Sequence, residues 1–250
     1  MSDIPELTIL LGPVTGVSTA LNWLVRKYSG ALADAGVVAY ANRFASPILR
    51  RHLGDKPAEA RALAFHEETA KRPALLSALN FLGSPHAGLK AGEIFPNAEV
   101  SIAGLTAIAP QARLVLSIDT LPAFFLAAAS DPLEARVRRT RWEVLYELSW
   151  ADLAREVKEA VPDCDLLVLT PDGAATGGPH VLRHLFGNAA DVFPDGYALL
   201  RAQMAQTGHA VLDRLIKDGE PSSDVLEELQ KSFAVRPTKD ELQVRLGLDK

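Results

Sequence analysis

The stretch Leu7–Tyr28, LTILLGPVTGVSTALNWLVRKY, decides the fold of this 250-residue chain. Leu7–Leu11 is a short apolar run that ends at Gly12-Pro13, a pattern typical of a buried strand followed by a turn. Beyond this turn apolar residues recur at helical spacing, so we expect a helix to begin near Ser18 or Thr19. A strand, a loop of small residues and a helix in this order direct free backbone N–H groups at the loop, where they attract phosphate or sulfate.

Apolar runs alternate with helical patterns along the rest of the chain. We expect further strands at 36–40, 80–82, 113–118 and 165–169. This alternation predicts an α/β fold of three layers, in which helices flank both faces of a parallel sheet. We assign residues 1–194 to this α/β domain and residues 195–250 to a helical C-terminal extension packed on it. The expected helices of the extension are 196–217, 222–233 and 238–246.

The composition limits the class of protein. Apolar residues make up 48% of the chain and the net charge is -5, which indicates a globular protein without general affinity for nucleic acid. No apolar run approaches the roughly 18 residues of a membrane span, and the first residues do not have the pattern of a signal peptide. The single cysteine, Cys164, fits a reducing compartment. We therefore expect a cytoplasmic protein with no nucleic-acid partner and no membrane span.

The loop 12–19 is the candidate anion site. In parallel sheets, ligands bind beyond the carboxyl ends of the strands, which brings the loops 12–19, 83–88, 119–122 and 170–178 to one edge. The loop differs from a Walker A motif because three residues, not four, separate Gly12 from Gly16, and Val17 stands where lysine is required. One interpretation is an anion cradle made by the amides of residues 15–19 and the hydroxyls of Thr15, Ser18 and Thr19. The other is an ordinary turn before a capped helix.

Several segments resemble the bacterial sulfotransferase family. The opening is similar to the family's strand, GP-x-K-TGT-T/S loop and helix, followed by an L-x-x-AGV-x-Y element, here represented by Ala35-Gly36-Val37 and Tyr40. Residues 112–117 with 124–127 resemble the family's second phosphate-binding element. Residues 162–169 and 181–187 resemble a later strand and its VLRRLLG helix, so the resemblance covers roughly residues 7 to 190.

The resemblance implies a P-loop-type sheet, the donor 3′-phosphoadenosine 5′-phosphosulfate, and transfer of its sulfuryl group to a hydroxyl or amine of a small-molecule or carbohydrate acceptor. It places Thr15, Gly16, Val17, Ser18 and Thr19 at the donor. Two departures bear on donor binding. The loop lysine is missing, with one residue deleted between Val14 and Thr15. Asp119 aligns with the arginine that contacts the donor's 3′-phosphate, and a carboxylate there repels the phosphate that an arginine attracts.

His86 is the candidate general base. Family members place a catalytic acid or histidine after the corresponding strand, and Ser84-Pro85-His86 occupies that place here. Histidine suits the role because an imidazole ordinarily titrates near neutral pH. The alternative is a solvent-exposed loop histidine. His180 and His184 stand four apart, but a third metal ligand is not evident, so we expect a solvated helix face and no metal.

Three hypotheses of function follow from these observations. The first is a sulfotransferase with His86 as the base. The second is a non-catalytic sulfotransferase-fold scaffold or binding protein that has lost donor binding, which Val17 and Asp119 favour. The third is a nucleotide-dependent transferase in which Asp119 holds Mg²⁺. The arginines at 136, 138, 139 and 141 are either an additional anion contact or a charged helix face.

Overall fold

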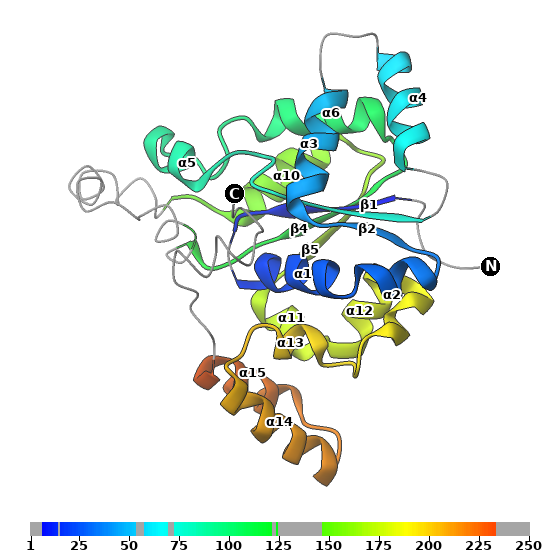
Figure 1. The fold of residues 1–250 in the computed structure, drawn as a ribbon. Helices are drawn as coiled ribbons and strands as arrows, with labels where there is room; N and C mark the ends of the chain where they lie inside the picture. Colours follow the sequence, from blue (N-terminus) through cyan, green and yellow to red (C-terminus); the bar gives the residue numbers. More distant parts are fainter. Residues whose placement is uncertain are drawn as a thin grey trace.

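The protein is an α/β protein built on a five-stranded, all-parallel sheet with helices on both faces, as expected (Figure 1). The computed structural model describes residues 7–14, 16–53, 58–69, 73–121, 124 and 147–233. Thr15, the arginine cluster at 136–141 and the helix expected at 238–246 lie outside the described residues. The strand order is β2-β3-β1-β4-β5.

The strand that opens the chain lies at the centre of the sheet. The strands are β1 (Leu7–Gly12), β2 (Val38–Tyr40), β3 (Ala74–Leu79), β4 (Arg113–Ser117) and β5 (Asp165–Leu169). β1 pairs with β3 on one side, in a register that sets Leu10 opposite Ser77, and with β4 on the other, which sets Leu10 opposite Val115. A strand paired on both edges and covered on both faces reads as the continuous apolar run seen in the sequence.

Alternate side chains of β1 enter two separate cores because successive residues of a strand face opposite sides of the sheet. Ile9 and Leu11 pack in one core and Leu10 in the other. The first core is covered by α3 (Asn42–His52), α4 (Ala58–Thr69), α6 (Ala98–Ile108) and α10 (Trp150–Ala160). The second is covered by α1 (Gly16–Lys27), α2 (Ser29–Asp34), α11 (Pro171–Thr176), α12 (Gly178–Phe186) and α13 (Ala198–Arg201). Figure 1 shows these two layers above and below the sheet.

The last described helices form a smaller third core. α14 (Gln206–Asp218) and α15 (Ser223–Phe233) bury Leu212, Leu226 and Leu229 together with Ala175 of α11 and Leu200 of α13. In Figure 1 the pair projects from the layer that contains α11 and α13. The remaining elements are α5 (Pro85–Ala91) and the 3-10 helix η1 (Gly187–Val192).

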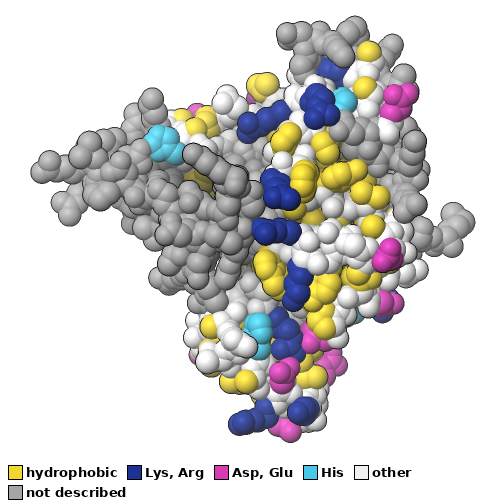
Figure 2. All heavy atoms as spheres, in the orientation of Figure 1, with side chains coloured by type: hydrophobic (Ala, Val, Ile, Leu, Met, Phe, Trp, Pro, Cys, Tyr) yellow, Lys and Arg dark blue, Asp and Glu magenta, His cyan; other side chains and the backbone are white. Residues whose placement is uncertain are grey.

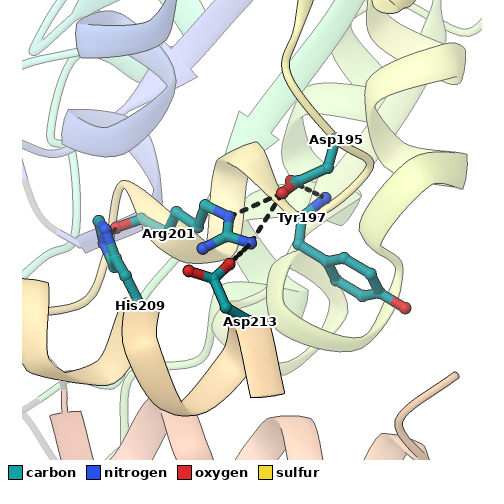
Figure 3. Close-up of polar contacts among 5 residues, drawn as sticks. All are labelled: Asp195, Tyr197, Arg201, His209 and Asp213. Atoms are coloured by element: carbon teal, nitrogen blue, oxygen red, sulfur yellow. Dashed lines mark hydrogen bonds and ion pairs between the residues drawn. The ribbon is translucent and has the colours of Figure 1, made fainter. Parts of the chain in front are cut away.

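An ion-pair network attaches α14 to α13 (Figure 3). The guanidinium of Arg201 lies 2.8 Å from Asp195 and 2.7 Å from Asp213. His209 Nε2 lies 2.7 Å from the Arg201 carbonyl oxygen. Burial alone would lower the pKa of Arg201, but the bonds to Asp213 and Asp195 outweigh it and raise this pKa. The guanidinium of Arg201 therefore stays positively charged between α13 and α14.

Three predicted elements were wrong. The strand expected at 80–82 is a turn in which Asn80 has φ 57°, and the strand is instead β3, six residues upstream and buried throughout. A short apolar run gives no periodicity that separates strand from helix, which is why ALLSAL escaped detection. The helix expected at 196–217 is two helices, α13 and α14. The loop expected at 170–178 instead contains α11, capped by Thr170, whose hydroxyl accepts from Gly173 N.

Among the described residues no helix is long and apolar enough to cross a membrane.

Candidate functional site

The candidate site is the carboxyl edge of the sheet around the end of β1. The chain leaves β1 toward the layer of α1, whereas the residues that follow β3 and β4, such as Phe81 and Phe124, pack in the opposite core. Where the chain leaves two neighbouring strands toward opposite faces of the sheet, the loops diverge and leave a crevice in which ligands bind. The three segments that meet there are 12–19, 80–86 and 117–121.

Gly12 is in close contact with residues at the carboxyl ends of both neighbouring strands, β3 and β4. Its φ of 140° is accessible to glycine, and a Cβ at this position would clash with the carbonyl and hydroxyl oxygens of Ser117. Ser117 Oγ donates to the Leu11 carbonyl at 3.0 Å, and Asn80 N donates to the Gly12 carbonyl at 2.8 Å. The backbone that leads into the loop is therefore fixed by β3 and β4.

The side chains expected to face an anion are packed inside the protein. Val17, Ser18 and Thr19 are buried, each 3% exposed or less. The hydroxyl of Ser18 donates to the Pro13 carbonyl, which closes the loop on itself. The hydroxyl of Thr19 has no hydrogen-bond partner within the described part of the chain. Among the described residues of the predicted cradle, 16–19, Gly16 at the start of α1 is the exposed one.

A carboxylate lies beside this open helix end. Asp119 follows β4, and its Oδ2 lies 3.3 Å from the position that a Cβ on Gly16 would take. Its other oxygen, Oδ1, accepts from Thr120 N at 2.7 Å, which fixes the orientation of the side chain. The amino end of a helix carries a partial positive charge, and a carboxylate there is stabilising by roughly 0.3–1 kcal/mol. The protein thus supplies its own anion at the start of α1.

His86 belongs to the same edge of the sheet but to another element. It is the second residue of α5, which begins after Ser84, whose hydroxyl accepts from Ala87 N at 3.1 Å. The His86 side chain is exposed. Ser84 therefore caps the start of α5, and His86 lies in the first turn of this helix.

The described residues do not group three metal-ligating side chains anywhere. His180 and His184 are both exposed on α12. The carbonyl oxygen of His184 accepts from Arg113, whose Nε also pairs with Asp165 at 2.5 Å. This arrangement links α12 to the amino ends of β4 and β5, at the opposite edge of the sheet from the loop.

The structure also reveals buried polar atoms that the sequence did not single out. Besides Thr19, the Nδ2 of Asn22, the hydroxyl of Ser77 and the Oδ1 of Asn80 have no hydrogen-bond partner among the described residues. Asn22 and Ser77 are fully buried. Ser77 is on the same face of β3 as Leu75, the face that α1 covers. A polar residue inside an apolar run is the signal that identifies Ser77 in the sequence.

Comparisons with protein-family models, with curated proteins and with solved structures each give no match to this chain. The P-loop type of sheet, which the resemblance to sulfotransferases implies, therefore stays a prediction.

Proposed function

We propose that this chain is a sulfotransferase-like α/β protein without sulfuryl-transfer activity, which works as a binding or scaffold protein. The observation that carries the proposal is the position of Asp119. Its carboxylate lies beside Gly16, at the end of α1 where the donor's anionic group would have to bind. Two like unit charges about 4 Å apart repel by roughly 1 kcal/mol in water and about 4 kcal/mol at a partly buried site.

The loop itself supports the same proposal. Val17 replaces the lysine that would neutralise the donor, and it is 1% exposed. The Ser18 hydroxyl is already engaged with Pro13. A cationic side chain bound to phosphate is among the strongest contacts that a protein makes, and none is present in the loop. Donor binding would thus need to overcome a carboxylate without a cation to offset it.

Calorimetric titration with 3′-phosphoadenosine 5′-phosphate tests this proposal. We expect no heat of binding to the wild-type protein at millimolar ligand. Asp119→Ser keeps a side-chain oxygen that can accept from Thr120 N but removes the charge, so this variant should bind at least tenfold more tightly than the wild type. Micromolar binding by the wild type, or transfer of radiolabelled sulfuryl group to any acceptor, would contradict the proposal.

In a second candidate function, the Asp119 carboxylate is a metal ligand. An aspartate that follows the strand next to β1, close to the start of α1, is a suitable Mg²⁺ ligand for a nucleotide. This candidate predicts that ATP raises the melting temperature only with Mg²⁺ present, and that Asp119→Asn abolishes the rise. The scaffold proposal predicts no such rise in the wild type.

A further inference from the structure

The edge of the sheet at β2 carries a concentration of positive side chains on a chain whose net charge is -5. β2 pairs with β3 alone, so it forms one edge of the sheet. The helix that follows, α3, has the sequence NRFASPILRRH and contains no acidic residue. Its buried side faces the core, while its outer side exposes Arg43, Phe44, Pro47, Arg50 and Arg51.

Positively charged side chains of α1, which belongs to the other helical layer, extend this surface. Asn42 N, at the start of α3, donates to Asn22 Oδ1 of α1 at 2.7 Å, which places the two helices in contact. Arg26 lies four residues after Asn22 and therefore on the same side of α1. Arg26 and Lys27 are both exposed. Figure 2 shows this face, where Lys and Arg side chains form a row that crosses it among hydrophobic side chains.

The surface has an apolar centre as well as charge. Phe44 is 51% exposed, an unusual amount for a phenylalanine. The guanidinium of Arg43 lies 4.4 Å from the centre of its ring. Pro47 has no N–H, so the Arg43 carbonyl loses the helical hydrogen bond that residue 47 would otherwise donate. No carboxylate of the described residues pairs with Arg43, Arg50 or Lys27. An exposed aromatic residue beside an arginine matches the residue types that are enriched at interface centres.

We propose that this α3 face, defined by Arg26, Lys27, Arg43, Phe44, Pro47, Arg50 and Arg51, binds an acidic segment of a partner protein. Charge complementarity argues for an anionic partner. A long polyanion or an anionic membrane would extend beyond the face and be repelled by the rest of a chain whose net charge is -5. A short acidic segment meets only the cations, and an apolar residue within it can pack on Phe44.

Fluorescence anisotropy with a labelled synthetic peptide tests the proposal. The probe has about twelve residues, with phenylalanine at every third position and glutamate elsewhere. We expect the wild type to bind it at low salt with a Kd on the order of 100 μM or less, and more weakly as salt is added. The double variant R43E/R50E should weaken binding more than tenfold, and F44A at least threefold.

The control is R155E/R183E, which makes the same change of charge at exposed arginines of α10 and α12. This control should bind the peptide within twofold of the wild type. No peptide binding, or an equal loss in the control, would overturn the proposal. Tighter binding to vesicles of anionic lipid or to a single-stranded oligonucleotide would overturn it in favour of that partner. The measurement does not involve the 12–19 loop, so its outcome is separate from that of the donor titration.

Discussion

Asp119 shows how one side chain can change the chemistry of a loop. A strand that runs into a helix normally leaves an anion-binding site at the helix start. Here the oxygen that lies beside Gly16 comes from the protein's own carboxylate. We expected from the sequence that Asp119 would oppose a phosphate, but only the structure shows that Asp119 and Gly16, more than a hundred positions apart in the chain, are adjacent.

Ser18 and Thr19 should respond oppositely to the loss of their hydroxyls. Ser18→Ala removes the buried bond to the Pro13 carbonyl, so we expect a loss of about 1–2 kcal/mol of unfolding free energy. Thr19→Val replaces a buried, unpartnered hydroxyl by a methyl group of similar size and should be neutral or stabilising by about 1 kcal/mol. Urea unfolding measures both. A large loss in Thr19→Val would show that its hydroxyl is bound in solution.

Cys164 should make stability depend on pH in the alkaline range. Burial is the main cause that raises the pKa of this thiol above its ordinary value of 9.0. Because the folded protein disfavours the thiolate, stability is complete below about pH 9 and falls as the pH rises above that value. Urea unfolding between about pH 8 and 10 should show a smaller decline in Cys164→Ala than in the wild type. Equal declines in the two proteins would contradict the assignment of this pH dependence to Cys164.

Helices and strands differed in how well the sequence predicted them. β1, β4 and β5 were predicted within one residue because each is a short apolar run bounded by turn formers. Ser149 caps α10, since its hydroxyl accepts from Ala151 N. β3 was missed because its sequence, ALLSAL, contains no β-branched or aromatic residue to distinguish it from a buried helix segment. The division between α13 and α14 is set by tertiary contacts, which no local pattern encodes.

The contact between α1 and α3 gives a prediction for these two elements. Asn22 is fully buried, and its Oδ1 accepts the N–H of Asn42 at the start of α3. Asn22→Ala should therefore cost about 1–3 kcal/mol of unfolding free energy, because it leaves a helix-start N–H unpaired. Asn97→Ala is the control, since Asn97 precedes α6, is exposed and makes no capping bond. It should change stability by less than about 0.5 kcal/mol. Similar losses in the two variants would contradict the linking role.

The whole molecule consists of a sheet with two helical layers and a helical pair attached to one of them. The division predicted near residue 195 stays a prediction: α14 and α15 form the third core with Ala175 and Leu200, but Ala198 and Leu199 of α13 pack in the second core. The order of the strands could not be predicted, because it depends on contacts between segments far apart in the chain. The position of the α3 face also required the structure, which brings α1 and α3 together.

The attachment of α14 should depend on Arg201. Arg201→Met leaves the carboxylates of Asp195 and Asp213 without their cation, and we expect a loss of about 1–3 kcal/mol because Asp213 is partly exposed to solvent. Compared with the wild type, the variant should show faster hydrogen exchange in α14 and α15. Exchange in β1, which packs in other cores, should change less. Arg183→Met, at an exposed ion pair with Asp191, should change stability by less than about 0.5 kcal/mol. Uniform acceleration of exchange across the chain would contradict a local role.

In the proposed function, the Asp119 carboxylate replaces an external anion at the start of α1. A crystal structure of the protein grown in concentrated sulfate tests it directly. We predict that no sulfate lies within hydrogen-bond distance of the Gly16 and Val17 amides and that Asp119 remains beside them. A sulfate bound to these amides, with Asp119 turned away, would contradict the claim and restore the loop as a donor site.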